Sequence, residues 1–286
     1  MEESQEMNQP IAIVTGASSG FGLLTTIELA KAGFQVIATM RNKERGGELL
    51  KKANRLTIQS NLIVQELDVT SEASIEQLAA RIKSIGRVDV LVNNAGYAAA
   101  GFVEEITMEE YRKQFDTNFF GVIAVTKTVL PFMRKQRKGK IINVSSISGK
   151  IAFPGLSPYV ASKHALEGWS ESLRLELSPF GIAVTLIEPG SYKTNIWSSG
   201  KQVTTLSLQT DSPYYKYMKS IEDYISSGEG QFGNPKDVAE KIASIASEEG
   251  SSLRHPIGKG VRTTLLLRNL IPWKLWEKIF IKKLHR

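Results

Sequence analysis

Short apolar runs alternate with longer segments of helical periodicity over most of this chain. Six of the runs are rich in β-branched residues and almost wholly apolar, as expected for strands buried on both faces of a sheet. These runs are 11–15, 34–40, 62–69, 88–94, 140–146 and 182–189. Helical spacing occupies the segments between them, at 22–32, 43–53, 71–85, 108–136 and 158–178. The repeated strand–helix order predicts an α/β fold with a doubly wound, mostly parallel sheet of the Rossmann type.

A stretch rich in Ser, Thr, Tyr and Gly interrupts this alternation at 191–232. A long insertion in a compact domain often forms a binding loop or a lid. We therefore interpret the chain as a single domain with a cofactor-binding and catalytic core at 10–190 and a substrate loop at 191–232. Beyond the loop we expect a helix at 234–248 and a last strand at 259–267.

Composition narrows the classes of function open to this chain. Of its 286 residues 42% are hydrophobic and none is cysteine, which excludes a disordered chain, a disulfide scaffold and cysteine-ligated metal sites. With three histidines, no metal site is expected. The N-terminal residues lack the basic-then-apolar order of a signal peptide, and no apolar run reaches about 18 residues. These features predict a cytoplasmic protein.

The net charge of +7 is concentrated at the C-terminal end. Residues 254–286 carry nine Lys or Arg and one acid, so the rest of the chain is nearly neutral and nucleic-acid binding is not expected. Residues 268–286 predict a basic amphipathic helix with Trp273, Trp276 and Phe280 near one face. Two interpretations stay open: peripheral contact with an anionic membrane, or packing on the substrate entrance or a subunit interface.

A glycine-rich turn follows the first predicted strand. Its glycines have the spacing GxxxGxG directly before a helix, where unpaired N–H groups and close backbone approach suit a pyrophosphate. An ordinary glycine turn is the alternative, but its place at the first strand–helix junction favours dinucleotide binding. The predicted contacts are Gly16, Ser18, Ser19, Gly20, Phe21 and Gly22.

The cofactor preference follows from the residues about 20 positions further on. Dinucleotide folds that take NAD place an acid there to bind the ribose hydroxyl. This chain has Arg41, with Lys43 and Arg45 close by. A guanidinium suits a 2′-phosphate, so we expect NADP(H) rather than NAD(H). The alternative is that these cations are simply solvated at a helix start.

A YxxxK sequence at Tyr159 and Lys163 places a phenol and an amine on one helical face. A nearby ammonium favours the ionised phenol, so we expect Lys163 to lower the pKa of Tyr159 and make it a general acid and base. A second YxxxK begins at Tyr215, but only the first accompanies polar residues at several predicted strand ends. We expect Tyr215 to be a lid or surface residue.

These motifs together resemble the short-chain dehydrogenase/reductase family. The matching segments are TGASSGFG, LDVT, NNAG, FDTNFFG, NVSSISG, YVASKHALEG and IEPGSYKT, in order over roughly residues 10–195. IATMRN and LEGWSESLRLELSPFGI further resemble its 17β-hydroxysteroid and retinol dehydrogenase-like branch. The resemblance also implies a homo-oligomer, a dimer or tetramer.

The resemblance implies specific roles. Tyr159 would exchange a proton with the substrate oxygen, Lys163 would tune it and bind the nicotinamide ribose, Ser146 would polarise the carbonyl, and Asn118 would anchor a water in a proton relay. The remaining cofactor contacts that it implies are Asp68, Val69, Asn94, Ala95, Gly96, Pro189, Gly190 and Thr194.

The substrate loop carries apolar and aromatic residues, which predict a hydrophobic alcohol or ketone of steroid, retinoid or lipid type. The expected pocket walls are Ile196, Trp197, Leu206, Leu208, Tyr214, Tyr215, Tyr217 and Met218, with Tyr97, Phe153, Pro154 and Leu156 from other loops. The alternative is that these side chains pack the loop onto the domain. Other functions left open are a 3-ketoacyl reductase acting on carrier-bound chains and a nucleotide-sensing module without turnover.

Overall fold

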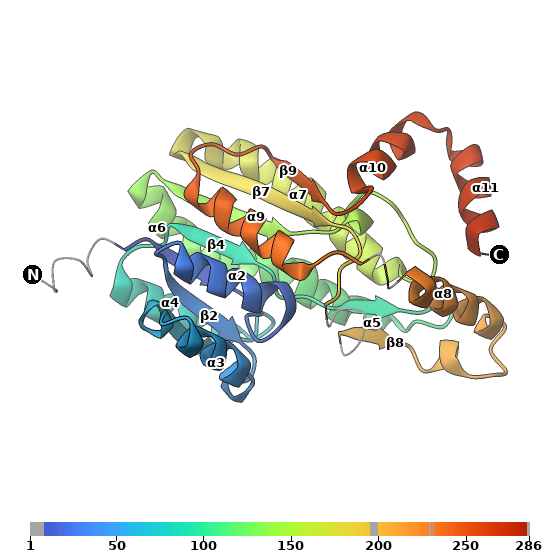
Figure 1. Ribbon diagram of the computed structural model, residues 1–286, viewed down its shortest axis with the longest axis horizontal. Coiled ribbons are helices and arrows are strands. Elements are labelled where there is room, and N and C mark those ends of the chain that lie inside the picture. The colour runs from blue at the N-terminus through green and yellow to red at the C-terminus, as the bar shows by residue number, and fades with distance from the viewer. Residues whose placement is uncertain (1–8, 195–199, 229, 231, 285–286) are drawn as a thin grey trace, which may run out of the picture.

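A computed structural model describes residues 9–194, 200–228, 230 and 232–284 (Figure 1). Seven strands form one parallel sheet in the order β3-β2-β1-β4-β6-β7-β9. Their bounds are β1 Ile11–Val14, β2 Gln35–Met40, β3 Leu62–Glu66, β4 Val90–Asn93, β6 Gly139–Val144, β7 Ile182–Pro189 and β9 Arg254–Ile257. The strand order reverses between β1 and β4, and crevices at such a reversal bind ligands in this class of fold. The predicted doubly wound Rossmann-like sheet in a single domain is confirmed.

Helices cover both faces of the sheet. One face carries α2 (Gly20–Lys31), α3 (Gly47–Arg55) and α9 (Pro235–Ser247), and the other carries α4 (Glu72–Ile85), α6 (Gly121–Gln136) and α7 (Ser157–Leu177) (Figure 1). Alternate residues of β1 face opposite layers: Ala12 and Val14 join the first core, and Ile11 and Ile13 the second. Burial on both faces explains why the strands are apolar without alternation.

The long helix expected at 108–136 contains a change of helical type. It consists of α5 (Met108–Phe115), a π-helical turn at Asp116–Phe120, and α6. Thr107 forms a capping box with Glu110 at its start. A π-turn inserts residues into the hydrogen-bond ladder and is frequent at functional sites. Here it contains Asn118, one of the predicted catalytic residues.

The predicted substrate loop is more regular than expected. It contains β8 (Lys201–Val203), a 3-10 turn at Leu206–Leu208, and α8 (Tyr215–Gly228). β8 pairs in parallel with β5 (Ala98–Ala100), which follows β4, in a second small sheet. Figure 1 places β5, β8 and α8 together beside the main sheet. We call residues 200–228 the lid; Ile196 and Trp197 lie outside the described residues.

The expectation of a last strand at 259–267 is wrong. The last strand is β9, and 259–267 enters α10 (Val261–Leu270) after Gly260, whose φ is +73°. β7 ends at Pro189, paired with Ile257, so a strand at 259–267 would have no partner. Pro256 fits β9 because an edge strand tolerates a missing N–H. The amphipathic helix is α11 (Trp273–Leu284), separated from α10 by a break rather than starting at 268. No helix among the described residues has the length and apolar character to cross a bilayer.

Candidate active site

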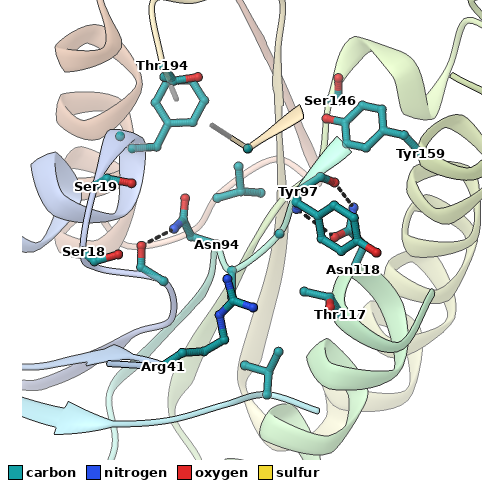
Figure 2. A pocket seen from close by; sticks show the side chains of 18 of the residues that line it. Ser18, Ser19, Arg41, Asn94, Tyr97, Thr117, Asn118, Ser146, Tyr159 and Thr194 are labelled. Atoms are coloured by element: carbon teal, nitrogen blue, oxygen red, sulfur yellow. Dashed lines mark hydrogen bonds between the residues drawn. The ribbon is translucent and has the colours of Figure 1, made fainter. Parts of the chain in front are cut away.

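A cavity of about 480 Å³ opens where the carboxyl ends of the central strands meet the lid. Figure 2 shows the glycine turn and Arg41 on one side of it, and Ser146 and Tyr159 on the other. All four predicted catalytic residues line it. The predicted cofactor contacts that line it are Gly16, Ser18, Ser19, Gly20, Phe21, Arg41, Asp68, Val69, Asn94, Ala95, Gly96, Pro189, Gly190 and Thr194. Gly22 is the predicted contact that does not.

The glycine turn depends on close backbone approach. Gly16 has φ +69°, and a Cβ there would lie 2.9 Å from the Cα of Ala95. Gly22 begins the buried side of α2, where a Cβ would lie 2.2 Å from the carbonyl oxygen of Gly16. Gly22 therefore supports the turn from behind, while Gly16 and Gly20 leave its front surface open to a ligand.

Asn94 holds the glycine turn against the end of β4. Its Nδ2 donates to the carbonyl oxygens of Thr15 (2.8 Å) and Gly16 (3.1 Å). The backbone N–H groups of Asn94 and Ala95 donate to the Thr15 hydroxyl at 2.9 and 3.0 Å. Figure 2 shows Asn94 beside the turn, at the centre of the crevice. These bonds fix the two strand ends that border the reversal point of the sheet.

Arg41 and Arg45 both line the cavity and are exposed. Arg41 follows the buried end of β2, and its guanidinium extends towards the centre of the cavity in Figure 2. Neither arginine forms an ion pair with the part of the chain that the structure describes. Lys43, the third cation of the group, does not line the cavity. Two unpaired guanidinium groups therefore border the end of the cavity nearest β2.

Tyr159 and Lys163 lie one turn apart on α7, and Ser146 follows the end of β6. Tyr159 and Ser146 share a hydrogen bond, and both are less than a tenth exposed. The Lys163 Nζ donates to the Val144 carbonyl oxygen at 2.7 Å and lies 5.8 Å from the centre of the Tyr159 ring. A hydroxyl, a phenol and an amine thus converge on one wall of the cavity.

Burial dominates the titration of this wall. It raises the pKa of Tyr159, and the hydrogen bond with Ser146 opposes that rise. The net shift in the pKa of Tyr159 is therefore upward, opposite to the lowering expected from the neighbouring Lys163. Burial also lowers the pKa of Lys163 to about 8, against the opposing pull of the Glu167 carboxylate. At neutral pH the phenol keeps its proton and is suited to donate it.

Asn118 is fully buried within the π-helical turn. Its Oδ1 accepts from the Tyr97 N–H at 3.2 Å, and its Nδ2 donates to the Tyr97 carbonyl oxygen at 3.0 Å. Gly96 allows this approach, since a Cβ there would lie 3.1 Å from the Asn118 Oδ1. Asn118 therefore joins α7, through a longer contact with Ser162, to the loop after β4.

A buried ionic cluster lies behind Lys163, and the sequence did not reveal it. The Arg254 Nε lies 2.9 Å from a Glu167 carboxylate oxygen and 3.3 Å from a Glu188 carboxylate oxygen. The Lys150 Nζ lies 3.5 Å from a Glu167 carboxylate oxygen. Glu167 and Glu188 are both almost fully buried. Burial first, then the neighbouring Glu167 charge, raises the pKa of Glu188 to about 7. The sequence did carry one sign of this cluster: Glu188 is a charged residue inside the otherwise apolar strand β7.

The lid reaches the cavity through residues that the sequence did not single out. Gly200 and Gln202 line it, as do Lys113, Asp116 and Thr117 from the α5 end. Of the described residues expected to wall a substrate pocket, Tyr97 lines the cavity. Tyr214, Tyr217 and Met218 instead pack the lid against Phe102, with the Phe102 and Tyr214 rings stacked at 4.5 Å. These three side chains therefore pack the lid onto the domain, which was the alternative to their forming a substrate pocket.

The other described residues that were expected to wall a substrate pocket lie in different parts of the structure and do not line the cavity. Leu206 and Leu208 are exposed, Leu156 is buried beneath the start of α7, and Phe153 contacts Phe280 of α11. Tyr215 begins α8 away from the cavity, as expected for the second YxxxK. Pro154 does not line the cavity.

The cavity fits a dinucleotide. Gly16 and Gly20, both with positive φ, keep the turn free of side chains, and the N-terminal end of α2 begins there. Asn94 fixes the far side of the turn through its bonds to the carbonyl oxygens of Thr15 and Gly16. Backbone donors and guanidinium groups without an acidic partner are the chemistry that phosphate groups need.

Comparison with known proteins gives a consistent result. A family model described as short chain dehydrogenase matches residues 10–203. An uncharacterized oxidoreductase of Bacillus subtilis, YusZ, is 52% identical over 97% of this chain and 99% of its own length. The 3-ketodihydrosphingosine reductase of Bacteroides thetaiotaomicron is 38% identical over 88% of this chain and 89% of its own. Human retinol dehydrogenase 8 is 36% identical over 85% of this chain and 79% of its own length.

Two solved structures share the fold closely. A short-chain dehydrogenase from Streptomyces avermitilis has a TM-score of 0.80 and 33% identity, covering 95% of this chain and 97% of that one. The actinorhodin polyketide ketoreductase, solved with NADPH, has a TM-score of 0.75 and 30% identity, covering 89% of this chain and 98% of that one. Sequence and structure comparisons therefore agree on one family.

Proposed function

Because this chain belongs to the short-chain dehydrogenase family, we propose that it catalyses the NADP(H)-dependent interconversion of a hydrophobic ketone and its alcohol. That it is an oxidoreductase follows from the family; the cofactor and the substrate class are our proposal. The observation that carries it is the convergence of Asn118, Ser146, Tyr159 and Lys163 on one wall of the cavity that the glycine turn borders.

The chain's own residues provide the cofactor site. The glycine turn and the start of α2 would hold the pyrophosphate, and Lys163 the nicotinamide ribose. Arg41 and Arg45 support a preference for NADP(H), since both border the cavity without an acidic partner among the described residues. The NADPH bound to the similar polyketide ketoreductase gives independent support. When bound, the nicotinamide supplies the hydride.

The protein supplies the proton and the electrostatic environment. Tyr159 holds a proton at its phenolic oxygen, because burial raises its pKa, and releases it to the substrate oxygen as negative charge develops there. Ser146 hydrogen-bonds the same phenol and is placed to stabilise that oxygen. Lys163, largely protonated below its pKa of about 8, holds positive charge beside the phenol and the Val144 carbonyl. At neutral pH the phenol therefore carries the proton that reduction of a ketone requires.

The substrate class rests mainly on relatives. Two similar proteins bear the names of enzymes for 3-ketodihydrosphingosine and retinol, both of which have a long hydrocarbon part. On this chain, the apolar core of the lid lies next to α11, and Tyr97 and Gln202 border the cavity. We infer a lipid-like ketone whose apolar part extends towards the lid.

One set of assays tests this proposal. We expect consumption of NADPH with long-chain, steroid and retinoid carbonyl compounds, and a higher kcat/KM for NADPH than for NADH. Tyr159→Phe should lower kcat at least about 100-fold, because the proton donor is lost, while NADPH affinity measured by fluorescence stays the same. Arg41→Asp should reduce the preference for NADPH.

Other outcomes would point elsewhere. Near-normal kcat in Tyr159→Phe would remove this residue from the chemistry. A preference of the unmodified chain for NADH would overturn the cofactor proposal. Turnover of carrier-bound 3-ketoacyl chains alone would favour a ketoacyl reductase, and NADPH binding without turnover on any carbonyl would favour a nucleotide sensor.

A further inference from the structure

The two C-terminal helices expose an unusual amount of apolar surface. Seven large apolar side chains of α10 and α11 are between 40% and 70% exposed. They are Leu266, Leu267, Leu270, Trp273, Leu275, Ile279 and Ile281. Figure 1 shows that α10 and α11 project from the layered body, and that no other element covers their outer side in this view. Trp273 lies seven positions before Phe280 and therefore on the same side of α11 as Phe280. We call the other six residues and the basic side chains between them the C-terminal face.

The inner sides of the same helices are held by the body. Val261 of α10 is buried, and Phe280 of α11 contacts the Phe153 ring at 5.7 Å and the apolar core of the lid. Arg268 lies over the Trp273 ring at 5.0 Å, which links the two helices across their break. The outward direction of the C-terminal face is therefore set by contacts on the opposite side.

The charge on these helices is mostly positive. Arg262, Arg268, Lys274, Lys278 and Lys282 accompany a single acid, Glu277. None of these five cations forms an ion pair with a described residue. Lys278 and Lys282 follow Leu275 by three and seven positions, so cations flank the exposed apolar side chains on α11.

We propose that the C-terminal face docks on the surface of an anionic lipid bilayer. Helices that combine exposed large apolar side chains with unpaired Lys and Arg lie in the headgroup region of such membranes. Anionic headgroups supply the counter-charges that the chain does not. A second copy of this chain is less suitable, because a symmetric contact would bring the same cations together.

The position of this face beside the lid has a consequence that rests on the proposed function. Phe280 belongs to the inner side of α11 and packs with Met218 and Ile221 of the lid. A bilayer on the outer side would therefore lie one helix away from the lid. A lipid-like ketone dissolved in that bilayer would reach the lid without crossing bulk water.

Vesicle co-sedimentation of the full chain tests the docking. We expect the protein to pellet with phosphatidylcholine vesicles that contain about 30% phosphatidylserine, at least about tenfold more than with phosphatidylcholine alone, and less at high salt. The triple variant Lys274→Glu, Lys278→Glu, Lys282→Glu should fall to the level of neutral vesicles. A second triple variant, Leu270→Ser, Leu275→Ser, Ile279→Ser, should also fall to that level, because it loses the apolar side chains that would enter the bilayer.

A matched control separates local from overall charge. Lys51→Glu, Lys83→Glu, Lys135→Glu changes exposed lysines of the body by the same total charge, and should pellet like the unmodified chain. Equal loss in this control, or recovery of the unmodified chain in the supernatant, would overturn the proposal. So would a drop in molar mass of the serine variant without any vesicle binding, which would assign the face to a second copy. Vesicle binding is measured without turnover. A protein that does not bind vesicles would therefore overturn the docking proposal, while the proposed activity is tested separately by the NADPH assays.

Discussion

Glu188 is a carboxyl group within the otherwise apolar strand β7, and this position controls its chemistry. It is 1% exposed and shares Arg254 with Glu167. Burial makes the charged form costly, so the pKa of Glu188 rises from 4.5 to about 7. The cluster continues to the reacting groups, because Glu167 lies one helical turn after Lys163 and raises its pKa. The cluster therefore stabilises the ammonium that stands beside Tyr159.

The raised pKa of Glu188 makes stability depend on pH. Between pH 4.5 and about 7 the folded chain binds more protons at Glu188 than the unfolded chain, so its contribution to the free energy of unfolding falls as pH rises. Glu188→Gln cannot ionise and removes this loss. We expect the variant to gain about 2 kcal/mol on the unmodified chain between pH 5 and pH 8 in urea unfolding.

Glu171→Gln is the control, because Glu171 contacts the same arginine from an exposed position. Its hydrogen bond to Arg254 lowers the pKa of Glu171. The stability that this carboxylate contributes is present above its ordinary pKa and is lost only as pH falls through the lowered value. The difference in the free energy of unfolding between Glu171→Gln and the unmodified chain should therefore be constant between pH 5 and pH 8. The same constant difference for Glu188→Gln would contradict the burial argument.

Local motifs revealed the reacting residues, but not the groups that surround them. Tyr159 and Lys163 are four positions apart, so helical spacing alone predicts that they share a face. Glu188 and Arg254 are far apart in sequence, and only the pairing of β7 with β9 brings them together. The pKa of Tyr159 was predicted in the wrong direction for the same reason. Burial depends on the whole fold, which spacing does not contain.

At the scale of elements, the glycine turn and the start of α2 act as one unit. Gly22 does not line the cavity, yet its missing Cβ lets α2 approach the carbonyl of Gly16 and the side chain of Asn94. The glycine spacing predicted this close backbone contact, because glycine is needed where two backbone segments approach without room for a Cβ. The end of the sheet was less predictable. The residues at 259–267 look like a strand, and only the end of β7 explains why they form a helix.

Gly22→Ala tests the role of this close packing. The new Cβ would lie 2.2 Å from the Gly16 carbonyl oxygen, so α2 or the turn must move. We expect a loss of about 1–3 kcal/mol in the free energy of unfolding and a weaker affinity for NADPH. Both are measurable on the same protein, by urea unfolding and by titration of nucleotide fluorescence.

Gly168→Ala is the matched control, because Gly168 also lies within a helix, in the middle of α7. It is exposed, and a Cβ there would meet nothing within 4 Å. Alanine is the better helix former, so this variant should gain about 0.5–1 kcal/mol with NADPH affinity unchanged. Equal effects of the two substitutions would show that helix propensity, and not contact with the turn, decides the outcome at Gly22.

At the scale of the whole molecule, three distant segments meet in the apolar core of the lid. The loop after β5 contributes Phe102, the lid contributes Met218 and Ile221, and α11 contributes Phe280. Glu105 accepts hydrogen bonds from Ser207 and Ser212, which holds the lid to the body from the other side. The sequence predicted a lid at this place and gave packing of the C-terminal helix on the substrate entrance as one of two interpretations, but spacing alone did not indicate that Phe280 would complete the apolar core of the lid. Such contacts join residues more than a hundred positions apart.

Phe280→Ala tests whether this apolar core controls substrate binding. The substitution removes the ring that contacts Phe153 and the lid, while the glycine turn lies on another element and is untouched. In lipid-free assays we expect KM for long-chain ketones to rise at least about threefold, with kcat on a short soluble ketone and the affinity for NADPH unchanged. Ile281→Ala removes a neighbouring side chain that is 45% exposed, and should leave all three quantities unchanged. If Phe280→Ala instead lowered kcat equally for short and long ketones, α11 would support the reacting groups, and the lid would not be the site of substrate selection.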